Sequence, residues 1–404
     1  MKRTYIILKK AEPQFRGIGD GGLRFGGRGE TSPPGVEFDK MERSQAREVS
    51  RAPEVEAVIP EIPLKLVRPL AHPAADPAAV EGGVAWGIRA VGANDTPFSG
   101  AGVKVAVLDT GIDSNHVAFA GVNLTEVDYT GEGNGDQDGH GTHCAGTIFG
   151  RDVGGVRIGV ARGITEAFIG KVIGQSGGGT AALLKAIREA TEAGCQIVSM
   201  SLGFDFPGAA ARLQKEEGFP ADLANAVALA DYRANIRLFD RLGEFIQAQS
   251  LSSPRELLLF AASGNESRRD VDPMYEMPAS PPGEAVGFTS VGALGLSPGG
   301  KLSVAPFSNA GCNISAPGVG ILSARAGTKS DLVAFSGTSM AAPHAAGVAA
   351  LFAEKARSQP AASSFFRSRQ SLLIRMLGEA TTTALAPGFT GAQVGQGLIR
   401  VPGV

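Results

Sequence analysis

The sequence predicts an α/β protein with a mostly parallel central sheet, helices on both faces of that sheet, and a small α+β unit at the N-terminus. From Val84 onward, short runs rich in β-branched residues alternate with longer helical segments. Such alternation is typical of parallel sheets built from β-α-β units. The chain has 404 residues, which is long enough for one large domain and a smaller one.

The first 80 residues differ in composition from the rest, and we predict a prodomain-like or docking unit that ends in a Pro- and Ala-rich linker. The elements expected in it are a strand over 4–9, a Gly-rich loop over 16–30, a charged helix over 39–51, a strand over 54–59 and the linker over 69–79.

Residues 81–404 are predicted to form the main domain. Its expected elements are a strand over 103–108, a helix over 181–193, a buried strand over 197–202, a helix over 221–249, strands over 256–262 and 290–294, and a helix of very small residues that begins near 338. Because that last helix is apolar on every side, we expect it to be buried.

Composition excludes several classes of protein. The net charge of −2 indicates no general attraction to nucleic acid or to anionic membranes. No apolar run approaches the length of a membrane span, and the one that follows Met1-Lys2-Arg3 is too short for a signal peptide. Three cysteines cannot all pair, which fits a reducing compartment, so we expect a cytoplasmic protein.

Two polar residues follow predicted buried strands. Asp109 closes the apolar run 105–108, where a carboxylate is costly unless a donor pairs with it. Asn265 follows the strand that ends at Ala262 and can extend its amide into a cleft. Sites in α/β folds lie beyond the carboxyl ends of such strands. Taken alone, either residue is also a common turn former.

A histidine lies between two glycines in the segment 138–147. Gly139 and Gly141 leave the ring of His140 accessible, and a carboxylate beside it would fix its tautomer, so His140 suits a general base. His140 and His143 could instead hold a metal ion. Since the glutamate of the HExxH pattern is absent, we expect no metal ligand here and a structural role for His143.

A Gly-Thr-Ser turn opens the small-residue helix. Ser339 lies in its first turn, next to backbone N–H groups that have no partner within the helix. Those groups can bind an oxyanion, so the hydroxyl is well placed to attack a carbonyl carbon. The alternative is a serine that serves only the helix cap.

Together these four residues resemble those of the subtilisin-like serine endopeptidases, the subtilase family. The resemblance implies a subtilisin-like catalytic domain over 81–404 that hydrolyses peptide bonds through a Ser acyl-enzyme. In it, Ser339 is the nucleophile, His140 is the general base and Asp109 orients His140. Asn265 and the Ser339 backbone N–H form the oxyanion hole.

The resemblance also implies a cleft that binds extended polypeptide substrates as an added β-strand. The matching substrate-binding residues belong to two Gly-rich strands and to the wall of the primary specificity pocket, and they are Gly177, Gly178, Gly179, Ser201, Leu202, Gly203, Ala262, Ser263 and Gly264. Glu266 at the pocket edge either favours basic residues or is simply solvated beside Arg268 and Arg269.

The chain departs from the family at the usual calcium loop, here Arg151 to Val156. The asparagine ligand of the family falls on Val153, and a second carboxylate falls on Ala118. Because Ca²⁺ needs several oxygen ligands, we expect no cofactor requirement and no tight calcium site there. Calcium sites elsewhere stay open.

Two further segments have no clear counterpart in the family core. A helical insertion is expected at about 204–255, either as a partner-binding or access-limiting element or as a structural addition. Residues 1–80 resemble the inhibitory prodomain of the family only in their last part. They imply either intramolecular inhibition by the N-terminal segment or a plain docking unit.

Two rival functions remain beside the endopeptidase. One is a peptide cyclase or other acyl transferase, which would use the same serine but exclude water from the acyl-enzyme. The other is a catalytically silent peptide-binding module. The masses of reaction products separate hydrolysis from cyclisation, and labelling of Ser339 by a fluorophosphonate separates both from the silent module.

Overall fold

In the computed structural model of this chain, the described residues are 2–10, 35–68, 70–71, 80–249, 257–297, 299–359 and 368–403. The chain divides into two compact units. The first comprises Met1–Ile62 and Phe206–Asn235, and the second comprises Pro63–Asp205 and Ile236–Val404. The first part of the predicted insertion therefore packs with the N-terminal residues, and the boundary near the N-terminus follows Ile62 rather than residue 80.

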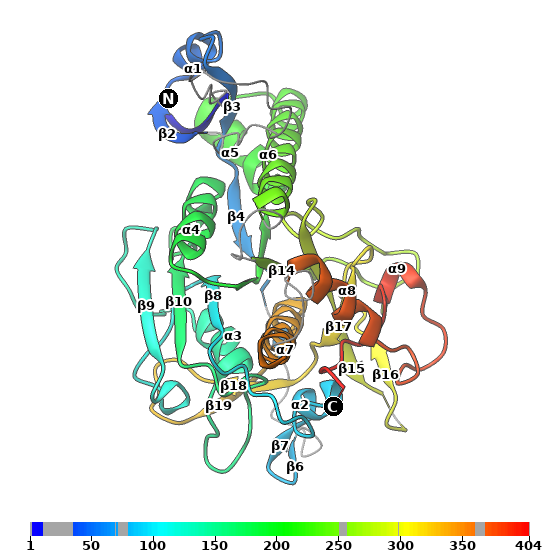
Figure 1. Cartoon of the computed structure of the whole chain (residues 1–404). Helices are drawn as coiled ribbons and strands as arrows, with labels where there is room; N and C mark the ends of the chain where they lie inside the picture. The colour runs from blue at the N-terminus through cyan, green and yellow to red at the C-terminus, as the bar shows by residue number, and fades with distance from the viewer. Residues whose placement is uncertain are drawn as a thin grey trace, which may run out of the picture. The chain divides into compact units, whose positions relative to one another are not determined.

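The second unit is built around an eight-stranded sheet. In spatial order its strands are β16 (Leu302–Val304), β15 (Phe288–Leu296), β14 (Leu258–Ala262), β12 (Ile197–Met200), β8 (Lys104–Asp109), β10 (Glu166–Lys171) and β9 (Asn123–Asp128), with β17 (Ile314–Pro317) beside β15 (Figure 1). Neighbouring strands run parallel except β15 and β16. The expected mostly parallel sheet is thus present.

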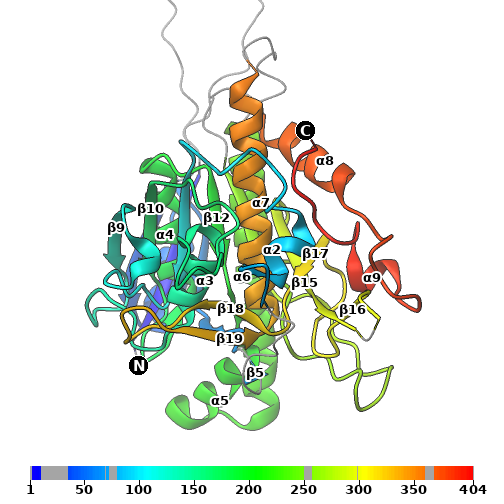
Figure 2. The ribbon, with the colours of Figure 1, turned by 90° about the horizontal axis from the view of Figure 1, so that it is seen from below.

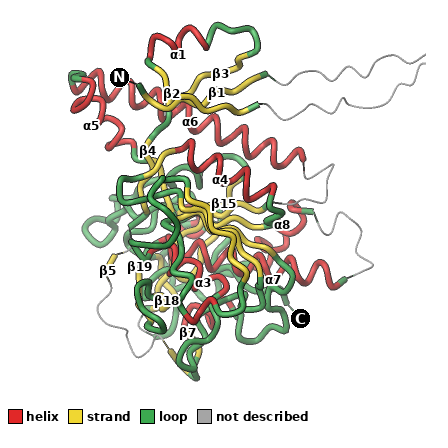
Figure 3. Tube along the Cα trace, turned by 90° about the vertical axis from the view of Figure 1, so that its left-hand side faces the viewer, coloured by secondary structure: helices red, strands yellow, loops and turns green. Residues whose placement is uncertain are grey.

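Helices cover both faces of this sheet (Figure 3). Val105 and Val107 of β8 share a hydrophobic core with α3 (His140–Phe149) and α7 (Thr338–Ser358). Because side chains alternate along a strand, Leu108 points to the opposite face. There it lies with Ala186 of α4 (Thr180–Glu192) around Gly170.

Helix α7 is buried on every side over residues 338–353, as its small residues predict. Figure 2 shows it as a long helix beside α3, and it also packs on β12, β14 and β15. A Cβ atom on Gly347 would lie 2.6 Å from Cβ of Val160, so glycine is needed for this close approach. Within the described part of the chain, each helix is too short or too polar to cross a membrane.

The smaller elements of the second unit surround this core. They are β5 (Leu70–Ala71), β6 (Val80–Glu81), β7 (Val84–Ala85), α2 (Trp86–Val91), η2 (Val117–Phe119), β18 (Ile321–Ala324), β19 (Leu332–Ser336), α8 (Arg369–Glu379) and α9 (Gly391–Val394). A further three-stranded sheet, β11-β4-β13, belongs to the candidate site described below.

The first unit has a three-stranded antiparallel sheet. Its central strand β1 (Arg3–Lys9) pairs with β2 (Val36–Met41) and β3 (Val55–Pro60), and its helices are α1 (Arg43–Val49), α5 (Phe206–Glu217) and the first part of α6 (Ala221–Gln249). Arg3 forms ion pairs with Glu217 and Asp231. Buried Asn235 donates to the Pro60 carbonyl over 2.9 Å.

The predicted start of the helix over 39–51 was wrong. Residues up to Met41 belong to β2, and α1 begins at Arg43, where Glu42 and Gln45 form a capping box. The helix expected over 221–249 is confirmed as α6. The Gly-rich loop over 16–30 and nearly all of the linker over 69–79 lie outside the described residues.

Candidate active site

Asp109 and His140 form a buried hydrogen-bonded pair. Asp109 is the last residue of β8, and His140 is the first residue of α3. His140 Nδ1 donates to Asp109 Oδ1 over 2.7 Å, and the two side chains are 0% and 1% exposed. Burial is the largest single influence and lowers the pKa of His140, but Asp109 and Cys144 together, through charge and hydrogen bonding, hold this pKa well above its ordinary value.

Asp136 ties the end of β8 to the start of α3. Its Oδ1 accepts from Thr110 Oγ1 over 2.9 Å and from Gly139 N over 2.8 Å. Its Oδ2 accepts from Thr142 N over 2.8 Å and from Thr142 Oγ1 over 2.6 Å. Sequence reasoning missed this residue, and the available signal was a carboxylate just before a helix start, where it can satisfy backbone N–H groups.

Two glycines allow these segments to meet. A Cβ atom on Gly141 would lie 2.2 Å from the Gly111 carbonyl oxygen. Gly111 itself has φ of +107°, which side chains rarely adopt. The backbone can therefore place His140 directly beside Asp109.

Ser339 and Asn265 both bond to the chain's own residues 67 and 68. Ser339 lies in the first turn of α7, and its hydroxyl donates to the Val67 carbonyl over 2.7 Å. Asn265 follows β14 and donates from Nδ2 to the Arg68 carbonyl over 3.1 Å. Asn265 Oδ1 accepts from both N and Oγ1 of Thr338 over 2.9 Å, so the amide group is fixed with its N–H₂ toward residues 67 and 68.

Cys144 lies beside both His140 and the Ser339 backbone. Its Sγ lies 4.0 Å from His140 Nδ1 and 3.4 Å from the Ser339 carbonyl oxygen. Among the described residues, His140 Nε2 has no hydrogen-bond partner, and the Ser339 hydroxyl bonds to Val67. The structure thus joins Asp109 to His140 by a hydrogen bond, while the Ser339 hydroxyl donates to Val67 and not to His140 Nε2.

The predicted substrate strands flank a segment of the chain itself. Strand β4 (Pro63–Leu66) pairs antiparallel with β11 (Gly178–Gly179) on one side and with β13 (Leu202–Phe204) on the other. The register places Leu64 opposite Gly178 and Lys65 opposite Gly203. Beyond β4, the Val67 N–H donates to the Ser201 carbonyl over 3.4 Å.

The remaining predicted site residues lie close by. Gly177 turns the chain into β11 with φ of +96°. Ala262 and Ser263 are buried, and the Gly264 N–H donates to Thr338 Oγ1 over 3.1 Å. A cavity of about 480 Å³ is lined by the β4 segment together with the end of β10, the loop that leads into β11 and the strand ends, among them Thr110, Lys171, Gln175, Asn265 and Glu266.

Sequence reasoning did not place residues 63–68 between these strands. Leu64, Leu66 and Val67 are buried, whereas Arg68 is exposed. The available signal was the short alternation of leucines around Lys65, which is typical of a strand with one buried face. Its partners are glycine-rich strands far away in the sequence, so the sequence did not identify them.

His143 has structural contacts. Its Nε2 lies 2.9 Å from the Ile321 carbonyl oxygen, and its ring stacks on Phe335 at a centroid distance of 4.7 Å. Burial lowers the pKa of His143 to about 3, so the ring is neutral. The one group of potential metal ligands among the described residues is Asp109, His140 and Cys144. Ion binding there would have to break the Asp109–His140 hydrogen bond.

Arg151 is the first residue of the loop at which the family usually binds calcium. The Arg151 guanidinium donates to the carbonyls of Phe149, Arg162 and Ile164. Ala118 is fully buried and, like Val153, offers no side-chain oxygen. The two positions where the family's side-chain ligands would fall therefore supply no side-chain oxygen for Ca²⁺.

Comparison with known proteins agrees with this geometry. The chain matches the subtilase family over residues 100–397. It is 34% identical over 257 residues to the subtilisin-like serine protease AsES of Sarocladium strictum, which covers 63% of this chain and 54% of that protein. It is 31% identical over 279 residues to the M-protease of Shouchella clausii, covering 67% of this chain and 60% of that protein.

Subtilisin Savinase of Lederbergia lenta is 30% identical over 279 residues, which cover 67% of this chain and 85% of that protein. The chain thus spans less than two thirds of the length of the first two relatives. The family match nevertheless covers most of this chain and includes all four residues singled out above. The resemblance expected from those residues is confirmed, and the chain belongs to the subtilase family.

Proposed function

We propose that this chain is a serine endopeptidase that hydrolyses peptide bonds through an acyl-enzyme on Ser339. The observation that carries the proposal is the 2.7 Å hydrogen bond from the Ser339 hydroxyl to the carbonyl of Val67. That carbonyl belongs to a segment held as a β-strand between β11 and β13. The hydroxyl donates to the oxygen of that carbonyl, so Ser339 Oγ lies beside the group whose carbon it would attack once its proton is directed to His140.

The chemistry assigns one role to each residue. Ser339 Oγ bonds to the carbonyl carbon while its proton passes to His140 Nε2, which Asp109 keeps unprotonated by accepting from Nδ1. Asn265 Nδ2 and the Ser339 N–H stabilise the oxyanion. The C–N bond then breaks, and the leaving amine takes the proton from His140. Water, activated by the same imidazole, releases the acyl group and restores Ser339.

The N-terminal segment is proposed to inhibit this site from within the same chain. Residues 63–68 take the place of an extended polypeptide substrate, with backbone pairing to both Gly-rich strands. Val67 contacts Ser339 through its carbonyl and Ser201 through its N–H, so the bond between Val67 and Arg68 is the one proposed to be cut. Asn265 Nδ2 lies on the next carbonyl, that of Arg68, and would have to move to the Val67 carbonyl to stabilise the oxyanion. Substrates would bind in the same way, by β-strand addition.

The masses of the products test the endopeptidase against its rivals. A peptide that carries the sequence of residues 61–70 is incubated with the purified protein, and the products are weighed. We expect two fragments whose summed mass exceeds that of the peptide by one water. A cyclised product without added water would instead support an acyl transferase. An unchanged peptide, together with no fluorophosphonate on Ser339, would support a silent binding module.

We also propose that calcium does not stabilise the loop at Arg151. A site held at 100 times its dissociation constant would add about 2.7 kcal/mol to the free energy of unfolding. We therefore expect the thermal midpoint to be the same in excess chelator and in excess calcium. Arg151→Ala should lower it, because three carbonyls lose their donor at about 1–3 kcal/mol in total. A rise of several degrees with calcium in the wild type that is lost in Asp152→Ala, which removes the carboxylate of this loop, would contradict the proposal.

The cytoplasmic location, the absence of nucleic-acid partners and the absence of a membrane partner stay predictions from composition. All three cysteines are free and buried. Fractionation of the native host, followed by detection of the chain in each fraction, tests the compartment.

A further inference from the structure

Lys65 and Val67 lie on the same face of the segment in the cleft. Alternate residues of an extended strand point the same way, so Leu64 and Leu66 point to the opposite face. Both leucines and Val67 are buried. The Lys65 side chain is 34% exposed, and its Nζ lies 2.9 Å from Glu266 Oε1.

The Glu266 carboxylate is held in place by a group other than Lys65. Asn309, which is 1% exposed, donates from Nδ2 to Glu266 Oε2 over 2.7 Å. Asn309 Oδ1 accepts from the N–H groups of Glu266 and Ser267 over 3.1 and 3.0 Å, which orients the amide. One carboxylate oxygen is therefore held by Asn309, and the other faces Lys65.

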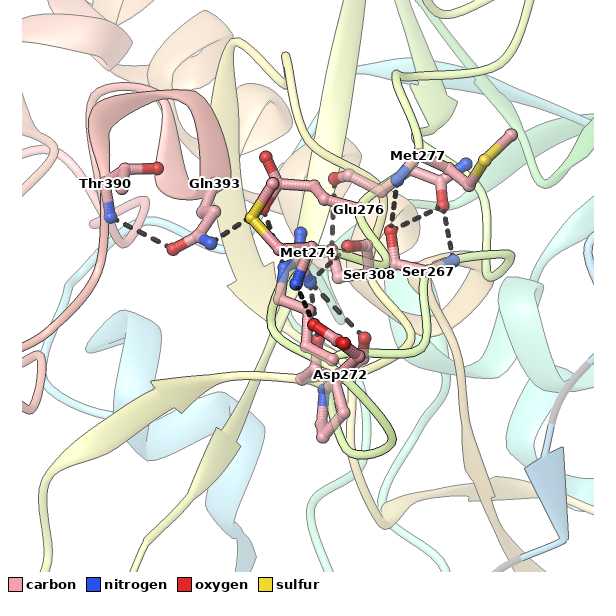
Figure 4. A network of polar contacts seen from close by, with 12 residues as sticks. Ser267, Asp272, Met274, Glu276, Met277, Ser308, Thr390 and Gln393 are labelled. Atoms are coloured by element: carbon pink, nitrogen blue, oxygen red, sulfur yellow. Dashed lines mark hydrogen bonds and ion pairs between the residues drawn. The ribbon is translucent and has the colours of Figure 1, made fainter.

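The loop that begins at Glu266 is itself braced (Figure 4). Ser267 Oγ accepts from the Met277 N–H over 2.9 Å and contacts Asn309 Oδ1. Glu276 accepts from Arg269 Nε over 2.8 Å and from Gln393 Nε2 over 2.7 Å. Such bracing reduces the ordering cost that usually cancels the benefit of a partly exposed ion pair.

We propose that Glu266 determines specificity by binding a basic side chain on the third residue before the scissile bond, and that Asn309 positions Glu266 for this contact. The inference rests on the proposed function, because Lys65 is third before the Val67–Arg68 bond only if that bond is the one cut. The proposed substrates are peptides with a basic residue at this position. One aliphatic residue precedes the basic residue, and two aliphatic residues follow it.

Internal competition between two peptides tests the proposal. One carries Leu-Lys-Leu-Val-Arg, and its twin has glutamine in place of lysine. Both are cut in one tube, and the ratio of the products is measured by mass spectrometry. This ratio does not depend on how much of the protein is folded. We expect the wild type to cut the lysine peptide about fivefold faster, which corresponds to a favourable exposed ion pair of about 1 kcal/mol.

Variants then locate the source of the preference. Glu266→Gln should bring the ratio to about one, and Glu266→Lys should make a glutamate peptide the better substrate. Asn309→Ser should reduce the ratio, because the carboxylate loses the amide that orients it. The control is Asp138→Asn, which removes a carboxylate that lines the same cavity and should keep the preference for lysine.

Three outcomes would overturn the proposal. A wild-type ratio near one would show that the lysine is not recognised, and a ratio unchanged in Glu266→Gln would show that another group recognises it. Cleavage of both peptides in either of these cases would leave the endopeptidase proposal intact. If neither peptide is cut, the endopeptidase proposal fails, and the specificity proposal fails with it.

Discussion

Replacing Ser339 with alanine is expected to leave the chain uncut and to reduce peptide hydrolysis about 10⁶-fold. That magnitude was measured for loss of the nucleophile in subtilisin, a member of this family, and does not come from the geometry of this chain. The physical reason is that the acyl-enzyme needs an oxygen where Ser339 Oγ contacts the Val67 carbonyl. Mapping N-termini by mass spectrometry should reveal a new terminus at Arg68 in the wild type and none in the variant.

Ser358→Ala is the matched control for this experiment. Ser358 ends the same helix, α7, and its exposed hydroxyl contacts only the Lys355 carbonyl among the described residues. This variant should be cut at Arg68 at the wild-type rate. If Ser339→Ala were also cut at Arg68, cleavage would come from a contaminating protease, and the proposed nucleophile would be wrong. A wild-type chain that stays whole while it hydrolyses added peptide would contradict the self-cleavage and the inhibition by residues 63–68, but not the endopeptidase activity.

Replacing Asp109 with asparagine is expected to lower kcat about 10⁴-fold, the size of effect known from subtilisin and from other Asp-His-Ser proteases. Asp109 Oδ1 accepts from both His140 Nδ1 and the Thr110 N–H. An asparagine amide can instead donate to Nδ1. His140 would then carry its proton on Nε2 and could not accept the serine proton. Asp152→Asn, at an exposed ion pair with Arg162, should leave kcat unchanged.

The same substitution should shift the pH dependence of kcat/KM. His140 acts as a base only when neutral, so activity is lost as the pH falls through its pKa. In the wild type that pKa is raised by Asp109 and Cys144 together in spite of burial, and Asp109 is the larger of the two. Without the carboxylate charge, burial dominates and lowers the pKa, so the acidic limb should move to lower pH. An acidic limb that stays in place would mean that another group controls it.

The sequence determined much of this protein because several of its signals are local. Asp109 at the end of an apolar strand, His140 between glycines, and Ser339 at the start of a small-residue helix each show their local structure in a few neighbouring residues. Burial of α7 follows from composition alone, since a helix that is apolar all round has no face for water. These features were sufficient for the fold class and for the family.

Only the tertiary structure decided which distant groups meet. The β4 segment lies between strands more than one hundred residues further along the chain, and its backbone bonds to β11 and β13 carry no residue-specific signal. Asn309 reaches Glu266 from the loop between β16 and β17, and Arg151 donates to the Ile164 carbonyl, 13 residues further along the chain. Hydrogen bonds of this kind depend on where the chain returns in space, which local periodicity does not encode.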